Sequence, residues 1–145
     1  MRCSLVGQIE SPLEAFVNPS SFKIYQADTG LLVSKAGAQR ADILAGIGGT
    51  FMSALTENYV AQQLSAIGYP LHYWTRDNRA EIDFVVERQG CVSAIEVKAG
   101  ENTRSRSLSS LKKSHPGVRL IRLSTKPFGM NDGLRSIPLY AAFCL

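Results

Sequence analysis

Long apolar runs and a cysteine framework are both missing from this 145-residue sequence. No apolar stretch approaches the roughly 20 residues of a membrane-spanning helix, and the N-terminal segment MRCSLVGQIESP lacks the apolar core of a signal peptide. The 3 cysteines are odd in number and have no CxxC spacing, which argues against a disulfide framework and a structural zinc site. We therefore expect a soluble, cytoplasmic protein with reduced thiols.

Signals for nucleotide binding and for internal repeats are missing as well. The glycine-rich stretch 46–50 lacks the lysine and the spacing of a phosphate-binding loop. With 45% hydrophobic and 19% charged residues, the composition is that of a globular domain with a core. Pro12, Pro19 and scattered apolar residues predict that residues 1–20 are an irregular lead-in or linker from a missing N-terminal region, followed by a single domain over residues 21–145.

Acidic residues are scarce in the last third of the chain. Residues 98–145 carry 9 basic and 2 acidic side chains, whereas residues 1–97 carry 7 basic and 10 acidic ones. Clustered lysines and arginines neutralise phosphates without reading a base sequence, so this region favours a polyanion such as nucleic acid. A solvated, lysine-rich surface explains the same charges equally well.

The most informative stretch that is present is EIDFVVERQGCVSAIEVK, residues 81–98. Apolar and polar residues alternate on both sides of a Gln-Gly dipeptide, which predicts two half-buried strands joined by a two-residue hairpin loop. In that register Phe84 faces Ile95, and Asp83 faces Glu96. Apolar pairs then lie on one face of the hairpin and acidic residues on the other.

Two directly opposed carboxylates, with Cβ atoms about 5 Å apart, repel each other unless something neutralises them. A divalent cation with oxygen ligands would neutralise Asp83 and Glu96. Lys98 projects from the same face as Glu96 and could reach a water or a phosphate beside that cation. The alternative is a solvated face on which Lys98 pairs with Glu81 or Glu96 and no chemistry takes place.

A long helix is predicted from residue 50 to residue 67, because the segment has no interior glycine or proline and is followed by a Gly-Tyr-Pro tripeptide. Glu57 falls among its core-facing residues. An ionised carboxylate there is costly unless it has a partner or a metal ion. Alternatively, Glu57 swings out to solvent or pairs with an arginine such as Arg76.

The remaining segments predict shorter elements on either side of the hairpin. They are a strand over 71–75, a helix about 108–113, and strands over 118–123 and 137–140. With the long helix and the hairpin, the order is α-β-β-β-α-β. We therefore expect an α/β fold, with a mixed β-sheet flanked by helices.

A helix glutamate (Glu57), a strand aspartate (Asp83) and a Glu-x-Lys motif on the next strand (Glu96 and Lys98) resemble the PD-(D/E)XK nuclease superfamily in element order and motif. More narrowly, FKIYQADTGLL, TENYVAQQL, YWTR, EIDFVVE and IEVKAG are similar to segments of the prokaryotic domain of unknown function 4143. That family typically follows an AAA-type ATPase domain in the same polypeptide. The resemblance covers nearly the whole chain, but Ile82 replaces the proline that precedes the aspartate in the superfamily.

The resemblance implies a restriction-endonuclease-like fold and divalent-metal-dependent hydrolysis of phosphodiester bonds in nucleic acid, with DNA as the expected substrate. Asp83 and Glu96 would be the ligands of Mg²⁺ or Mn²⁺, Lys98 would position or activate the attacking water, and Glu57 would complete the site. Basic side chains would grip the nucleic-acid backbone. The candidates for this role are Arg104, Arg106, Lys112 and Lys113.

Two other functions stay open at this point. The domain could be a catalytically weak or inactive nuclease fold that binds DNA or docks partners for the ATPase, or it could be a scaffold for protein contacts. The ATPase domain would lie outside this chain. The oligomeric state does not follow from the sequence.

Overall fold

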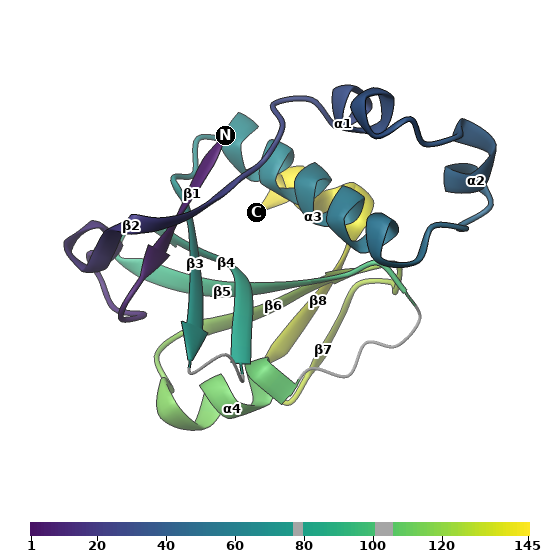
Figure 1. Cartoon of the computed structure of the whole chain (residues 1–145). Helices are drawn as coiled ribbons and strands as arrows, with labels where there is room; N and C mark the ends of the chain where they lie inside the picture. The colour runs from purple at the N-terminus through teal and green to yellow at the C-terminus, as the bar shows by residue number, and fades with distance from the viewer. Residues whose placement is uncertain (77–79, 101–105) are drawn as a thin grey trace.

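An eight-stranded sheet forms the centre of the protein in a computed structural model that describes residues 1–76, 80–100 and 106–145 (Figure 1). In chain order the elements are β1 (Arg2–Val6), the 3-10 helix η1 (Leu13–Phe16), β2 (Val17–Ile24), α1 (Thr29–Ala36), α2 (Arg40–Leu44), α3 (Gly49–Ala66), β3 (Leu71–Arg76), β4 (Ala80–Arg88), β5 (Cys91–Lys98), α4 (Arg106–Ser114), β6 (Arg119–Ser124), β7 (Gly129–Asn131), β8 (Leu134–Pro138) and the 3-10 helix η2 (Leu139–Cys144).

The strands are arranged in the order β2-β1-β3-β4-β5-β6-β8-β7. Neighbouring strands are parallel at β1–β3, β5–β6 and β6–β8, and antiparallel at the other junctions. The predicted mixed α/β architecture is confirmed. The segment α3-β3-β4-β5-α4-β6 has the predicted α-β-β-β-α-β order.

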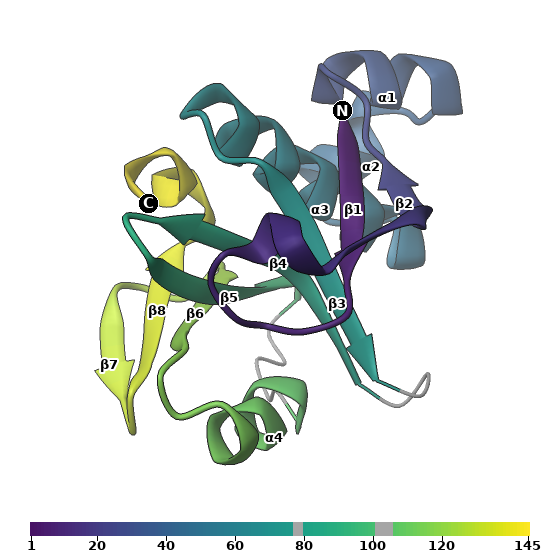
Figure 2. The same ribbon diagram turned by 90° about the vertical axis from the view of Figure 1, so that its left-hand side faces the viewer.

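Helices pack on both faces of the sheet. One core cluster joins α3 and η2 to the sheet, and the second joins it to α4 and to the connection between β1 and β2. Figures 1 and 2 show α3 and α4 on opposite sides of the strands. In β6, Ile121 belongs to the α3 cluster and Leu120 to the α4 cluster, because successive side chains of a strand alternate between faces. In the part of the chain that is described, no helix is long and apolar enough to cross a membrane.

Residues 2–6 form an interior strand, so the prediction of irregular structure across residues 1–20 is wrong. β1 lies between β2 and β3, and its residues Cys3 and Val6 are fully buried. The register of β1 against β2 shifts between Ser4 and Leu5. Such an irregularity interrupts the period-two alternation by which a strand is recognised in a sequence. Whether a further region precedes this segment stays a prediction.

The predicted strand over 137–140 is replaced by a strand that starts and ends earlier. β7 and β8 form a hairpin around Asp132 and Gly133, which have φ angles of 48° and 75°. An Asp-Gly pair is a typical two-residue hairpin loop, so the sequence itself carries a signal for this hairpin. Pro138 ends β8 and immediately precedes the first residue of η2, which explains the shifted boundary.

The predicted register of the central hairpin is confirmed over the pairs from Phe84–Ile95 to Arg88–Cys91. Its two-residue loop is Gln89-Gly90, with φ angles of 52° and 73°. Positive φ at both residues is the signature of a type I′ turn, whose twist matches that of the two strands. This turn sets which side chains of β4 and β5 share a face.

Replacing Gly90 by alanine is therefore expected to lower the free energy of unfolding by about 1 kcal/mol, because a residue with a Cβ is strained at this φ. The matched control is Gly117→Ala, where φ is not positive and an added Cβ meets nothing within 4 Å. Urea denaturation of both variants measures the difference. A loss at Gly90 no larger than that at Gly117 would contradict the prediction.

Candidate functional site

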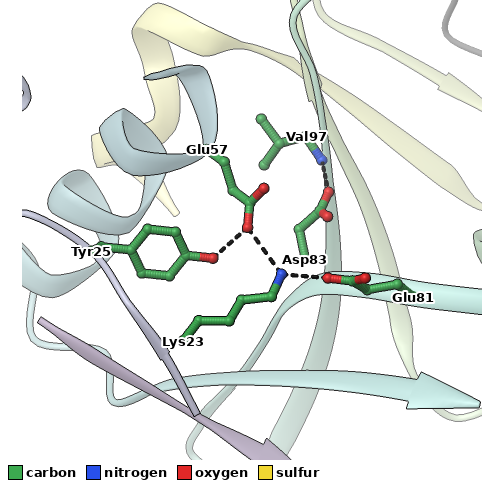
Figure 3. Close-up of polar contacts among 6 residues, drawn as sticks. All are labelled: Lys23, Tyr25, Glu57, Glu81, Asp83 and Val97. Atoms are coloured by element: carbon green, nitrogen blue, oxygen red, sulfur yellow. Dashed lines mark hydrogen bonds and ion pairs between the residues drawn. The ribbon is translucent and has the colours of Figure 1, made fainter. Parts of the chain in front are cut away.

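The β4–β5 hairpin opens one residue beyond the pair Phe84–Ile95, and Asp83 lies at that point. The predicted pairing of Asp83 with Glu96 is not part of the ladder. Instead, Asp83 Oδ2 accepts a hydrogen bond of 2.7 Å from the backbone N–H of Val97 (Figure 3). On the other side of β4, the register against β3 shifts in the same region, between His72 and Trp74. A bulge of this kind re-aims a side chain and ends strand pairing, which explains the change.

Burial gives Asp83 an unusual protonation equilibrium. The pKa of its carboxyl is raised from 3.8 to about 7, mainly because of desolvation. The hydrogen bond from Val97 and the charge of Lys23 lower this pKa, whereas the charges of Glu57 and Glu96 raise it. Asp83 thus lies within electrostatic range of carboxylates from α3 and from β5. Strongly raised carboxyl pKa values are concentrated at functional sites.

Glu96 extends from β5 and is only 5% exposed. Its Oε1 forms an ion pair of 2.9 Å with Lys98 Nζ, as the non-catalytic interpretation of this strand expects. Its Oε2 is buried and has no hydrogen-bond partner. A buried carboxylate oxygen without a partner is costly, so this atom is a vacant acceptor beside Lys98.

Glu57 lies on α3 and is half-buried, and it contacts two residues that the sequence analysis gave no role (Figure 3). Glu57 Oε1 accepts a hydrogen bond from the Tyr25 hydroxyl and lies 3.1 Å from Lys23 Nζ. Lys23 is also paired with the exposed Glu81. The expected alternative partner, Arg76, instead lies over the Trp74 ring.

The environment of Lys23 and Tyr25 shifts both of their pKa values upward. Burial lowers the pKa of Lys23, but its hydrogen bond to Glu81 and the charge of Glu57 raise it more. Burial, followed by the charge of Glu57, raises the pKa of Tyr25. Lys23 is therefore a fixed ammonium group between two carboxylates, and Tyr25 is a neutral donor to Glu57.

Lys23 and Tyr25 carried a signal that the sequence analysis did not use. On and just after β2 they alternate with Phe22 and Ile24, whose side chains are exposed. In this segment the polar residues face inward and the apolar ones outward, the reverse of an ordinary surface strand. The same region is tied to α3 by Asn58, whose Oδ1 accepts a hydrogen bond of 2.8 Å from Gln26 N–H.

The acidic residues around Asp83 do not form a metal site that is built from protein ligands alone in the described part of the chain. No group of three or more histidine, cysteine or acidic residues able to hold a metal occurs among the described residues. Mg²⁺ is commonly held by one or two carboxylates, with waters and substrate phosphates completing its shell. Glu96 Oε2, which lacks a partner, and the half-buried Asp83 carboxyl would be the two hard oxygen donors for such an ion.

The basic residues predicted to grip nucleic acid have different environments. Lys113 is exposed on α4. Lys112, on the same helix, pairs with Asp132, at 2.5 Å from Oδ1 and 2.6 Å from the backbone oxygen. Arg106 begins α4, but its side chain and the whole of Arg104 lie outside the described residues.

The comparisons with known proteins show the family to which the chain belongs. The family described as Domain of unknown function (DUF4143) matches residues 52–142. Uncharacterized proteins of Mycobacterium bovis and Mycobacterium tuberculosis are each 35% identical to the chain over 124 residues. These alignments cover 80% of the chain but 27% of each relative, so the chain spans about a quarter of the length of the curated relatives it matches. No solved structure is significantly similar. Since the family match covers more than half of the sequence, the chain belongs to the family of domains of unknown function DUF4143.

Proposed function

We propose that the protein hydrolyses phosphodiester bonds of nucleic acid, with DNA as the expected substrate, at a divalent-cation site formed by Asp83 and Glu96. The observation that carries the proposal is the presence of two desolvated carboxyl groups, Asp83 and Glu96, where the β4–β5 ladder ends. Asp83 has a pKa raised to about 7, and Glu96 Oε2 is buried without a partner. A divalent cation would relieve both costs.

The element order and the Glu-x-Lys motif support a restriction-endonuclease-like topology of the PD-(D/E)XK type. Bound Mg²⁺ or Mn²⁺ would supply a Lewis acid and a water of lowered pKa. Lys98 Nζ, next to Glu96, stabilises negative charge that develops on the phosphate oxygens. Hydrolysis adds water across a phosphorus–oxygen bond and leaves one hydroxyl and one phosphomonoester.

Glu57 has a positioning role in this proposal. Its Oε1 is engaged by Lys23 and Tyr25, so the carboxylate is fixed between α3 and the segment around β2. The fixed negative charge of Glu57 contributes to the raised pKa of Asp83. The negative charge of Glu57 thus increases the affinity of the site at Asp83 for a cation, by electrostatic attraction.

A specific observation favours a second function, a nuclease fold that binds DNA or docks partners without efficient cleavage. Lys98 already neutralises one oxygen of Glu96, and Lys23 lies between Glu57 and Glu81. The ammonium groups of these two lysines thus already neutralise part of the carboxylate charge that a metal ion would neutralise. In this alternative the binding of DNA depends on salt and is independent of metal.

An AAA-type ATPase domain is the partner that the family resemblance implies. The matched relatives are long enough to hold one, because the alignments cover 27% of each relative. Such a partner would present nucleic acid to the site or regulate access to it.

The test is cleavage of labelled single- and double-stranded DNA, with RNA as a control, by the wild type and by Lys98→Ala. We expect cleavage by the wild type in Mg²⁺ or Mn²⁺ and none in chelator. Loss of the Lys98 ammonium should slow cleavage by about 10²-fold, since it removes one stabilising charge from the transition state. Cleavage that persists in chelator or in the variant would exclude this site; wild-type protein that binds DNA without cutting it would favour the second function.

A further inference from the structure

An open pocket of about 710 Å³ is lined by residues of α4, β6 and the β7–β8 hairpin. Its lining includes three basic side chains, Lys112, Lys113 and Arg122, and one acidic side chain, Asp132. Lys112 is paired with Asp132, which is 85% exposed. The pocket therefore has an excess of positive charge, supplied by Arg122 and Lys113.

Arg122 is directly adjacent to Glu96 in the sheet. β5 and β6 are parallel, and Glu96 is the register partner of Arg122, as Ala94 is of Leu120. Neighbouring strands lie about 4.8 Å apart, and aligned residues of parallel strands point to the same face. Ala94 and Leu120 belong to the α4 core cluster, so Glu96 and Arg122 also lean toward the α4 face, whereas the charge of Glu57 on α3 acts on Asp83 from the other face, at the point where the β4–β5 ladder ends.

Although Arg122 is adjacent to Glu96, its guanidinium forms no ion pair among the described residues. Its Nε is buried and lacks a hydrogen-bond partner, and the ion pair of Glu96 is with Lys98 rather than Arg122. Arg122 is half-buried between the buried residues Ile121 and Leu123. Holding an unpaired cation in such a place costs free energy, which an incoming anion would offset.

We propose that Arg122 binds a phosphate of the nucleic-acid backbone next to the phosphodiester that is cleaved at Asp83 and Glu96. Guanidinium groups bind phosphates through paired hydrogen bonds, and the orphan Nε is one available donor. Lys113 adds a weaker, solvent-exposed attraction at the same pocket. The subsite rests on the proposed function for its place beside the cleaved bond, but binding to Arg122 itself does not require cleavage.

The chain offers a matched control on the same strand. Arg119 is exposed and lines a different pocket, with Tyr69 and Val86 of the α3 face. Arg119→Met and Arg122→Met remove the same charge from β6, and methionine keeps most of the aliphatic packing. Arg122→Gln is a second variant, in case the first fails to fold. Thermal unfolding of each variant checks that the fold is retained.

Binding is measured by fluorescence anisotropy of a labelled DNA duplex in chelator, over a range of salt concentrations. Arg122→Met should weaken binding by about 10-fold and reduce the slope of log affinity against log salt by about 1, whereas Arg119→Met should change affinity by less than about 2-fold. In Mg²⁺, Arg122→Met should raise KM by a similar factor and leave kcat unchanged.

Equal effects of the two methionine variants, or no DNA binding by the wild type, would overturn the subsite. If the wild-type protein binds DNA through Arg122 but does not cleave it, the nuclease function is overturned and the subsite is kept. If the protein cleaves DNA with a KM that does not depend on Arg122, the subsite is overturned and the nuclease function is kept.

Discussion

The Asp83→Asn variant is expected to lose metal-dependent cleavage by on the order of 10³-fold while the metal-free protein becomes more stable above about pH 7. The side chain keeps its shape, and the amide oxygen of the new side chain can still accept the Val97 N–H bond that Asp83 accepts at 2.7 Å. What disappears is a desolvated, half-buried negative charge that Glu57 and Glu96 repel. Activity and stability should therefore change in opposite directions.

The effect on cleavage separates a catalytic carboxylate from a structural one, because the gain in stability follows from the raised pKa of Asp83 in either case. If Asp83 served only to hold the open end of the hairpin, its replacement would leave any cleavage intact. The matched control is Glu87→Gln on the same strand, because Glu87 is hydrogen-bonded to the Ser11 hydroxyl and, at 2.9 Å, to the Leu13 N–H. Those bonds lower the pKa of Glu87. Glu87→Gln should destabilise by about 1 kcal/mol and should not affect cleavage.

The hairpin that carries the candidate site could be predicted because its information is local. The Gln-Gly loop and the alternation on each side set the register, and Phe84 pairs with Ile95 as expected. The opening at Asp83 could not be predicted in the same way. It coincides with a shift in the register of β4 against β3, which depends on two strands at once.

The partners of Glu57 required contacts that are distant in the sequence. Its placement on the core-facing side of α3 was readable from helical periodicity, but Lys23 and Tyr25 come from residues more than 30 positions earlier. β1 escaped prediction for a related reason, since its register shift against β2 breaks the period-two pattern. Local patterns therefore identified which residues carry charge, and tertiary pairing decided which charges meet.

Divalent cations are expected to stabilise the protein more at about pH 8 than at about pH 5. The pKa of Asp83 is raised from 3.8 to about 7, so the folded state binds this proton more tightly than the unfolded chain does. Its contribution to stability is complete below about pH 4 and is lost as the pH rises through about 7. Allowing for partial exposure, we expect metal-free protein to lose about 1 to 2 kcal/mol of unfolding free energy from this group between pH 5 and pH 8.

A cation at Asp83 and Glu96 must displace the proton of the Asp83 carboxyl. Cation binding therefore competes with protonation, and the affinity for the cation increases as the pH rises. Millimolar Mg²⁺ at about ten times its dissociation constant would return about 1.4 kcal/mol at pH 8 and much less at pH 5. Urea denaturation at both pH values, in chelator and in Mg²⁺, measures the four free energies. Subtracting the same four values for Asp83→Asn removes the titration of other groups, including the histidines. If stabilisation by Mg²⁺ is equal at the two pH values, or if it persists in Asp83→Asn, the cation binds elsewhere. If stabilisation by Mg²⁺ is confined to high pH and to the wild type, the proton and the metal ion bind to the same carboxyl group.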